Sequence, residues 1–110
     1  MTYKVVYTRE AEQDLINIYR YIAMNLGAAE TAKKQADRII NAIKGLDEMP
    51  LRHKFYQNEP WHSRGLRVLP VDNYLVLYMV VEKEKMVAIV RIMYGGRNID
   101  WQLSGSKIDD

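Results

Sequence analysis

The stretch between residues 52 and 67 carries most of the side chains whose chemistry suggests a binding site. One acid, Glu59, faces four cations there: Arg52, Lys54, Arg64 and Arg67. Guanidinium groups bind phosphates or carboxylates through paired hydrogen bonds, so charge alone does not separate RNA from an acidic protein partner or from a solvated basic surface. Phe55 and Trp61 either stack on a base or pack the loop down. The candidates for contact with nucleic acid or a protein partner are Arg52, Lys54, Arg64 and Trp61.

Three more arginine and tyrosine side chains lie at or near the last apolar run, residues 86–93. Arg91 sits among apolar neighbours, and an unpaired buried cation is too costly. We therefore favour a structural ion pair, with an acid of the helix hairpin such as Asp14. Tyr94 and Arg97 follow at the end of this run and remain candidates for a site.

Metal, cofactor and nucleophile chemistry find little support. His53 and His62 are nine residues apart, and no cysteine accompanies them, which matches no reliable metal-ligand spacing. The chain has no glycine-rich phosphate loop before a helix and no Gly-x-Ser-x-Gly turn. We expect neither a metal site nor a cofactor.

Composition indicates a soluble globular protein. Apolar residues make up 48% and charged residues 27% of the 110 positions, and the net charge is +2. The basic excess lies in residues 49–97, which hold eight Lys/Arg against four Asp/Glu. The absence of cysteine fits a reducing cytoplasm. No apolar run is long enough for a membrane-spanning helix, and the first residues do not resemble a secretion signal.

The first half of the chain is typical of a strand followed by two helices. Residues 3–7 are aromatic and β-branched, as in strands, and Thr8 is a good helix N-cap. Apolar residues then recur every three or four positions up to Ile22, and Gly27 ends the pattern. A second helix is predicted from about Ala28 to Leu46, before Pro50.

The second half is typical of a loop and three strands. Residues 49–64 have no periodicity, and loops of this length are often functional. Strands are predicted over 66–69, 74–81 and 86–93, joined by turns short enough to make neighbours antiparallel. Tyr74 and Tyr78 are expected in the core. Alternation places Val87, Ile89, Arg91 and Met93 on one face of the last strand, and Ala88, Val90, Ile92 and Tyr94 on the other.

The resulting order, β-α-α-β-β-β, predicts an α+β fold. The helix hairpin covers one face of a mostly antiparallel sheet, and the opposite face is left open. Residues 1–104 are expected to form a single domain, and residues 105–110 a polar, frayed tail.

Two segments at opposite ends of the chain resemble the RelE/ParE toxin superfamily. The first is Tyr7-Thr8-Arg9-Glu10-Ala11-Glu12-Gln13-Asp14-Leu15-Ile16-Asn17-Ile18 with Tyr21-Ile22-Ala23, similar to the opening of ParE-type toxins. The second runs from Gly65-Leu66-Arg67 through Tyr74 to Arg91-Ile92-Met93-Tyr94-Gly95-Gly96-Arg97. The resemblance spans about residues 3–103.

The resemblance implies the toxin of a type II toxin–antitoxin pair, neutralised by a cognate antitoxin. Operator DNA is then contacted only through the antitoxin. Members act in one of two ways: ParE-like toxins inhibit DNA gyrase, and RelE-like toxins cleave mRNA on the ribosome. An inactive adaptor that binds only its antitoxin is a third alternative.

The RelE pattern is incomplete in this chain. Arg67 and Arg97 match it, and Tyr94 is a further candidate for catalysis if the protein is RelE-like. Three other functional positions of that pattern fall on Leu69, Leu75 and about Leu103, which cannot supply a charge or a hydroxyl. The sequence therefore favours the ParE-like alternative, with DNA gyrase as the target.

Overall fold

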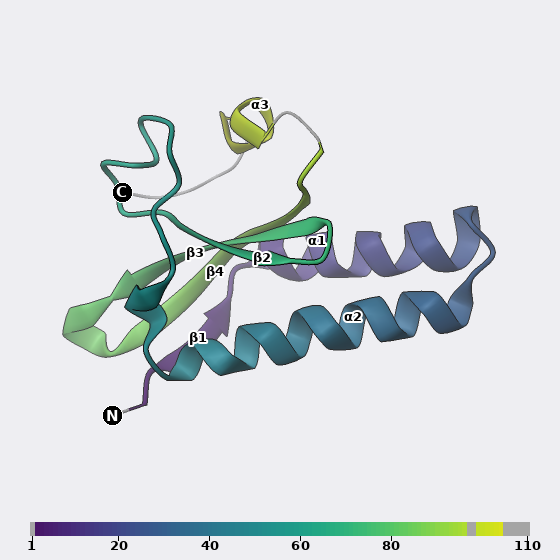
Figure 1. The fold of residues 1–110 in the computed structure, drawn as a ribbon, viewed down its shortest axis with the longest axis horizontal. Coiled ribbons are helices and arrows are strands. Elements are labelled where there is room, and N and C mark those ends of the chain that lie inside the picture. Colours follow the sequence, from purple (N-terminus) through teal and green to yellow (C-terminus); the bar gives the residue numbers. More distant parts are fainter. Residues whose placement is uncertain (1, 97–98, 105–110) are drawn as a thin grey trace.

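The computed structural model describes residues 2–96 and 99–104 of the chain. Its elements are β1 (Lys4–Tyr7), α1 (Arg9–Arg20), α2 (Ala29–Lys44), β2 (Arg67–Val71), β3 (Tyr74–Val81), β4 (Met86–Tyr94) and α3 (Ile99–Ser104) (Figure 1). The α+β class and the order of the first six elements confirm the expectation from the sequence. The short helix α3 was not expected.

The first helix begins at its predicted cap. The Thr8 hydroxyl accepts a hydrogen bond from the Ala11 N–H at 3.1 Å and donates one to the Val90 carbonyl at 2.9 Å, so the cap also ties α1 to the sheet. A turn of π-helix, Tyr21–Asn25, extends α1. Gly27 then adopts a φ of +63°, which glycine accepts without steric cost. The chain reverses there into α2, which confirms the helix hairpin.

The four strands form one sheet in the order β1-β4-β3-β2. β1 runs parallel to β4, and the other two pairs are antiparallel. The tight links on either side of β3 require antiparallel neighbours, whereas the long separation of β1 from β4 along the chain permits their parallel pairing. The hairpin of α1 and α2 lies along one face of this sheet (Figure 1).

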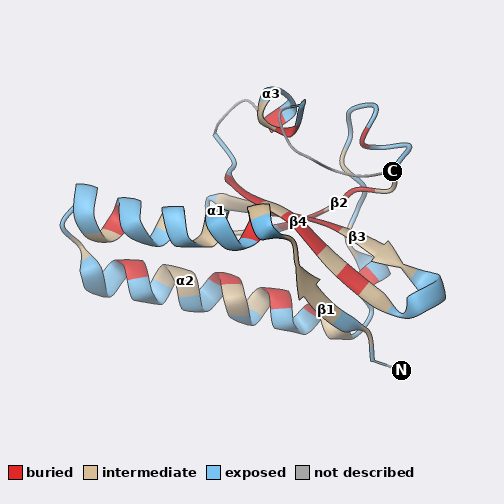
Figure 2. Cartoon of the chain, turned by 180° about the vertical axis from the view of Figure 1, so that it is seen from behind, coloured by how far each residue is buried: buried red, intermediate tan, exposed pale blue. Residues whose placement is uncertain are grey.

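An apolar cluster lies between the helix hairpin and the sheet. Its buried members are Ala11, Ile39, Ile43, Leu46, Leu69, Val76, Tyr78, Val87, Ile89 and Ile92. Figure 2 shows buried positions along β4 and at intervals along both helices. Ile39, Ile43 and Leu46 follow one another at intervals of four and three residues, as the helical period requires for side chains on one stripe. Tyr78 is fully buried, which confirms it as a core residue. Tyr74 is partly buried and packs against the edge of the same cluster.

A β-bulge in β4 changes the faces predicted for its second half. Tyr78 pairs with Ile89, and the next pair skips Val90, which has no partner in the register. One extra residue reverses the alternation that follows it. Ile92 therefore joins the cluster under the helices, and Met93 faces the other side. The strict alternation expected along this strand is wrong beyond the bulge.

The other face of the sheet is covered, which corrects the expectation that it is open. A second apolar cluster lies there, formed by Trp61, Leu66, Val68, Leu77, Val90, Met93, Ile99 and Leu103. In Figure 1, α3 and the long loop before β2 lie on the side of the sheet opposite the helices. Hydrogen bonds from the Tyr56 hydroxyl (2.6 Å) and the Asn58 amide (2.7 Å) to the Asp100 carboxylate join this loop to α3. The second face is thus closed by segments without a long periodic pattern.

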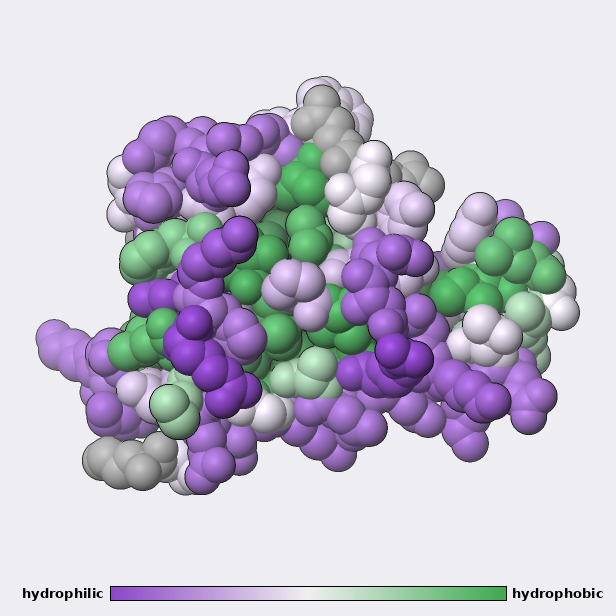
Figure 3. Space-filling model, viewed as in Figure 1, coloured by the Kyte–Doolittle hydropathy of each residue, from purple (hydrophilic) through white to green (hydrophobic). Residues whose placement is uncertain are grey.

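The end of the helix hairpin extends past the sheet and carries exposed apolar side chains. Met24 is 77% exposed and Leu26 is 60% exposed. Tyr21, a few residues earlier in the chain, is about half exposed. Figure 3 shows apolar residues gathered at this end of the molecule. We call Tyr21, Met24 and Leu26 the hairpin tip. Within the described residues, no helix combines the length and apolar character needed to cross a membrane.

Candidate functional site

The loop of residues 50–66, here called the basic loop, is held against the start of β2 by backbone hydrogen bonds. Phe55 forms an antiparallel bridge with Arg67. The Tyr56 N–H donates to the Leu66 carbonyl at 2.7 Å, and the Val68 N–H donates to the Lys54 carbonyl at 3.0 Å. These bonds continue the sheet for a few residues beyond its edge strand, so the backbone of residues 54–56 is held against β2.

The Arg67 side chain binds the backbone of the basic loop. Its Nη1 donates to the His53 carbonyl at 2.6 Å and to the Leu51 carbonyl at 3.1 Å. Its guanidinium lies over the ring of Phe55, with 4.0 Å between Cζ and the ring centroid, a cation–π geometry. Both bonds are to neutral carbonyls, so the positive charge of Arg67 is not cancelled by an acid.

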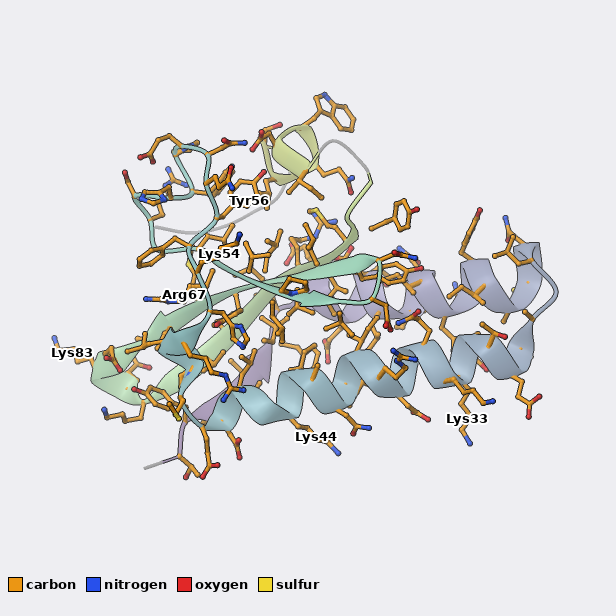
Figure 4. The ribbon with its side chains drawn as sticks, viewed as in Figure 1. Lys33, Lys44, Lys54, Tyr56, Arg67 and Lys83 are labelled. Atoms are coloured by element: carbon orange, nitrogen blue, oxygen red, sulfur yellow. The ribbon has the colours of Figure 1, made fainter. Side chains whose placement is uncertain are left out.

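The other predicted cations lie around this point or at the outer end of the loop. Arg52 and Lys54 are exposed, and Figure 4 shows Lys54 and Arg67 where the basic loop crosses the start of β2. Arg64 lies in the outer turn, where its Cζ is 5.3 Å from the Trp61 ring centroid. The structure therefore brings Arg52 and Arg67 close to the same side chain, His53, and Lys54 lies next to them on the basic loop.

The two aromatic candidates of the loop behave differently. Trp61 is only 7% exposed and belongs to the second apolar cluster, so its ring packs the loop against the sheet. Phe55 is 41% exposed. Its ring is held by Arg67 on one side and meets the His62 ring edge-on, with 5.5 Å between centroids. Of the two aromatics, Phe55 is the one whose ring is open to a partner.

The candidates for catalysis do not converge. Tyr94 lies at the far end of β4, opposite Tyr74, which pairs with Val71. Arg67 lies four residues from Val71 along β2, a separation of roughly 13 Å at about 3.3 Å per residue. The Tyr94 ring packs edge-on against Tyr74, with 5.7 Å between centroids. Arg97 lies outside the described residues.

Arg91 forms the structural ion pair expected from the sequence. Its Nε donates to Asp14 Oδ2 at 2.7 Å and its Nη2 to Asp14 Oδ1 at 2.9 Å. The hydrogen bonds to Asp14 raise the pKa of Arg91 against the effect of burial. Both side chains are largely buried between α1 and β4. Arg91 is thereby explained as a link between the helix hairpin and the sheet.

His53, considered from the sequence only as a possible metal ligand, lies close to two arginines of this region. Burial, together with the charges of Arg52 and Arg67, lowers the pKa of His53. Arg52 Nε lies 3.4 Å from His53 Nε2, and the lowered pKa favours the neutral form of this imidazole. Among the described residues, no group of three or more His, Cys, Asp or Glu side chains is arranged to hold a metal ion. In the sequence, Arg52 and Lys54 on either side of His53 indicate this positively charged environment.

Comparison with known proteins gives the family. The model of the ParE toxin of type II toxin–antitoxin systems (parDE) matches residues 5–99. The chain belongs to this family. The match includes α1, α2, the basic loop and all of the sheet except Lys4 of this ParE-family toxin. No curated protein matches its sequence.

Solved structures agree with the assignment. A chromosomal ParDE toxin–antitoxin system from P. aeruginosa has a TM-score of 0.69 and 25% identity to this toxin, over 84% of its chain and 96% of the other. A RelB–RelE toxin–antitoxin complex from Mycobacterium tuberculosis has a TM-score of 0.63 and 21% identity, over 86% and 99%. An archaeal RelE–RelB complex from Pyrococcus horikoshii has a TM-score of 0.60 and 18% identity, over 89% and 100%. The last two show a common fold.

Tyr78 is a buried residue that contacts the start of the basic loop. Its replacement gives a pH-dependent prediction for the stability of the ParE-family toxin. The buried Tyr78 hydroxyl donates to the Pro50 carbonyl at 2.6 Å, and burial raises the pKa of Tyr78 to about 12. We expect Tyr78→Phe to lower the free energy of unfolding by about 1–3 kcal/mol near neutral pH, because the Pro50 carbonyl loses its partner. The neutral phenol is favoured in the folded state, so this contribution is complete below about pH 10 and is lost as the pH rises toward 12.

Urea unfolding of both proteins, near neutral pH and at about pH 11, measures this difference. The stability gap between wild type and Tyr78→Phe should narrow by about 1.4 kcal/mol per pH unit above 10. A gap that is the same at both pH values would show that the phenol ionises as freely in the folded state as in the unfolded chain.

Proposed function

We propose that this protein inhibits DNA gyrase as the toxin of a type II toxin–antitoxin pair and acts by binding rather than by catalysis. The observation that carries the proposal is the ParE-family match over residues 5–99. Arg67 is level with Tyr78 in the middle of β3, whereas Tyr94 lies beside Tyr74 at the end of that strand. This separation also favours binding over catalysis, because catalytic groups must meet at one reacting centre.

The hairpin tip is the surface that we assign to the protein target. Tyr21, Met24 and Leu26 are exposed at the end of a rigid helix pair. Exposed apolar groups of this kind mark protein contacts, and methionine adapts its shape to a partner surface. π-helical turns such as Tyr21–Asn25 frequently occur at functional sites. The tip therefore supports recognition of a protein surface.

A cognate antitoxin is the second partner that we propose. The similar structures include a ParDE system and two complexes of RelE toxins with their antitoxins. We propose that the antitoxin neutralises this toxin in the cytoplasm, where gyrase works, and that operator DNA is contacted through the antitoxin. Arg52, Lys54 and Arg64 remain candidates for contact with a partner.

A RelE-like ribonuclease remains the alternative, and in that case Arg67, Arg97 and Tyr94 are the proposed catalytic residues. The positive charge of the basic loop favours this alternative. Against it, Arg67 Nη1 is already engaged by two carbonyls, and Tyr94 packs on Tyr74 far from the loop.

Two assays with purified protein test the proposal. In a gyrase supercoiling reaction we expect inhibition that depends on toxin concentration, and in a translating extract we expect intact message by primer extension. Met24→Glu with Leu26→Glu should weaken inhibition at least tenfold, because charge replaces the apolar contact, about 1.4 kcal/mol or more. Lys44→Glu, on the exposed side of α2, is the matched control and should inhibit as wild type does. Cleaved message with normal supercoiling would overturn the proposal.

A further inference from the structure

Phe55 is an aromatic ring fixed in an exposed position, and the function proposed above does not use it. Its backbone is bridged to Arg67, the Arg67 guanidinium lies over one face of its ring, and the His62 ring meets it in a T-shaped contact. The ring is nevertheless 41% exposed. An apolar ring left in water forgoes the stabilisation of burial, and here it is also held in one orientation. Such a ring offers a flat, ready surface for a planar ligand.

Three cations lie on or beside the segment that carries this ring. The Arg67 guanidinium lies over the ring and donates hydrogen bonds to two neutral carbonyls, and Arg52 and Lys54 are exposed on the same segment as Phe55. The acid of the loop, Glu59, is engaged by Ser63, whose N–H (2.9 Å) and hydroxyl (2.7 Å) both donate to its carboxylate. The Phe55 ring is therefore in contact with one cation and close in the chain to two more, and the acid of the loop is held by other groups.

We propose that the basic loop binds single-stranded nucleic acid, with an unpaired base stacked on Phe55 and the flanking phosphates held by Arg52 and Lys54. A π-face beside cations is the combination with which proteins bind single strands. A duplex hides the faces of its bases, and an acidic peptide has no flat group that needs the ring. Arg67, stacked on the other face of the ring, adds to the positive electrostatic potential and holds the ring in place.

This inference goes beyond the gyrase proposal, and the two can fail separately. It is tested with purified toxin and labelled oligonucleotides of about 12 nucleotides, whereas the gyrase proposal is tested by supercoiling. Single-stranded DNA and single-stranded RNA both offer an unpaired base and a phosphate, so we expect the toxin to bind both kinds of oligonucleotide. Duplex DNA of the same length should bind more weakly.

Fluorescence anisotropy at roughly 50 mM salt measures the affinities. We expect Phe55→Leu to weaken single-strand binding by about 5- to 100-fold, which is the loss of one stacked base, and Phe55→Trp to retain it. Lys54→Ala should weaken binding and reduce the slope of log affinity against log salt by about 0.7, for one lost phosphate contact. Lys33→Ala removes the same charge from α2, where Lys33 points away from the basic loop (Figure 4), and should leave the affinity within twofold.

Three results would overturn the inference. The first is the absence of measurable binding of both single strands by the wild type. The second is an equal loss of affinity in Lys54→Ala and Lys33→Ala, which would indicate a diffuse charge effect. The third is an unchanged affinity in Phe55→Leu. Circular dichroism and melting temperature of each variant show whether it is folded, and Phe55→Trp distinguishes loss of the aromatic face from disturbance of the loop.

Discussion

Replacing Asp14 with alanine is expected to lower the free energy of unfolding by about 3–5 kcal/mol. Asp14 Oδ1 and Oδ2 accept hydrogen bonds from the Arg91 side chain, and Oδ2 also accepts the Ile92 N–H at 2.9 Å. The Asp14 and Arg91 side chains are 13% and 17% exposed. Removing the carboxylate takes two hydrogen bonds from a largely enclosed guanidinium and one from a backbone N–H, which costs more than the loss of a surface ion pair.

A double-mutant cycle separates this effect from the loss of packing. Arg91→Met removes the cation but keeps an apolar stem, so Asp14→Ala with Arg91→Met should be more stable than the sum of the two single changes predicts. Glu12→Ala, on the exposed side of the same helix, is the matched control and should change stability by about 0.5 kcal/mol or less. Urea unfolding followed by circular dichroism measures all four variants. A cost below about 1 kcal/mol for Asp14→Ala would mean that the pair behaves as an exposed one.

Replacing Leu103 with alanine is expected to lower the free energy of unfolding by about 2–5 kcal/mol. Leu103 is fully buried in the second cluster, where Trp61 and Leu66 lie, and it belongs to a helix of six residues. A helix this short has little stability of its own, so α3 is held by this contact and by the bonds of Asp100 to the basic loop. Loss of the side chain therefore leaves a cavity and loosens the whole helix.

The tryptophans report this change directly. Trp61 is buried and Trp101 is 74% exposed, and the chain has only these two. In a Trp101→Phe background, Leu103→Ala should shift the emission of Trp61 to longer wavelength and increase its quenching by acrylamide, together with the loss of stability in urea. Unchanged emission and a stability change within about 0.5 kcal/mol would show that α3 does not depend on Leu103.

The elements that carry a regular apolar period were predictable from the sequence. The Thr8 cap, the reversal at Gly27 and the strand over 74–81 are all found in the structure. Each follows from local chemistry: a hydroxyl at the helix start, a glycine where φ is positive, and β-branched residues in sequence. The pair between Asp14 and Arg91 was also predictable, because a cation inside an apolar strand requires an acid.

The cover on the second face of the sheet was not predictable in the same way. It depends on Trp61, Leu66, Ile99 and Leu103, which lie in two segments more than thirty residues apart and follow no period. The bulge at Val90 likewise depends on the register between β3 and β4, which the apolar pattern of a strand buried on both faces does not specify.

The candidate site was predictable in composition but not in arrangement. The cations between residues 52 and 67 are evident from the sequence, and Arg52 and Arg67 do lie close to the same side chain, His53. The bonds of Arg67 to two loop carbonyls depend on how the loop crosses β2, and no local pattern encodes that crossing. The distance of Tyr94 from Arg67 follows from strand register for the same reason.

Induced expression in a bacterial host, with plasmid topology measured in the same cells, tests the central claim most directly. A gyrase-inhibiting toxin of the ParE family should arrest growth and shift a reporter plasmid toward relaxed topoisomers while its messages stay intact. Met24→Glu with Leu26→Glu should relieve both effects, and Lys44→Glu should relieve neither. Growth arrest with a fully supercoiled plasmid and messages cut during translation would contradict the account.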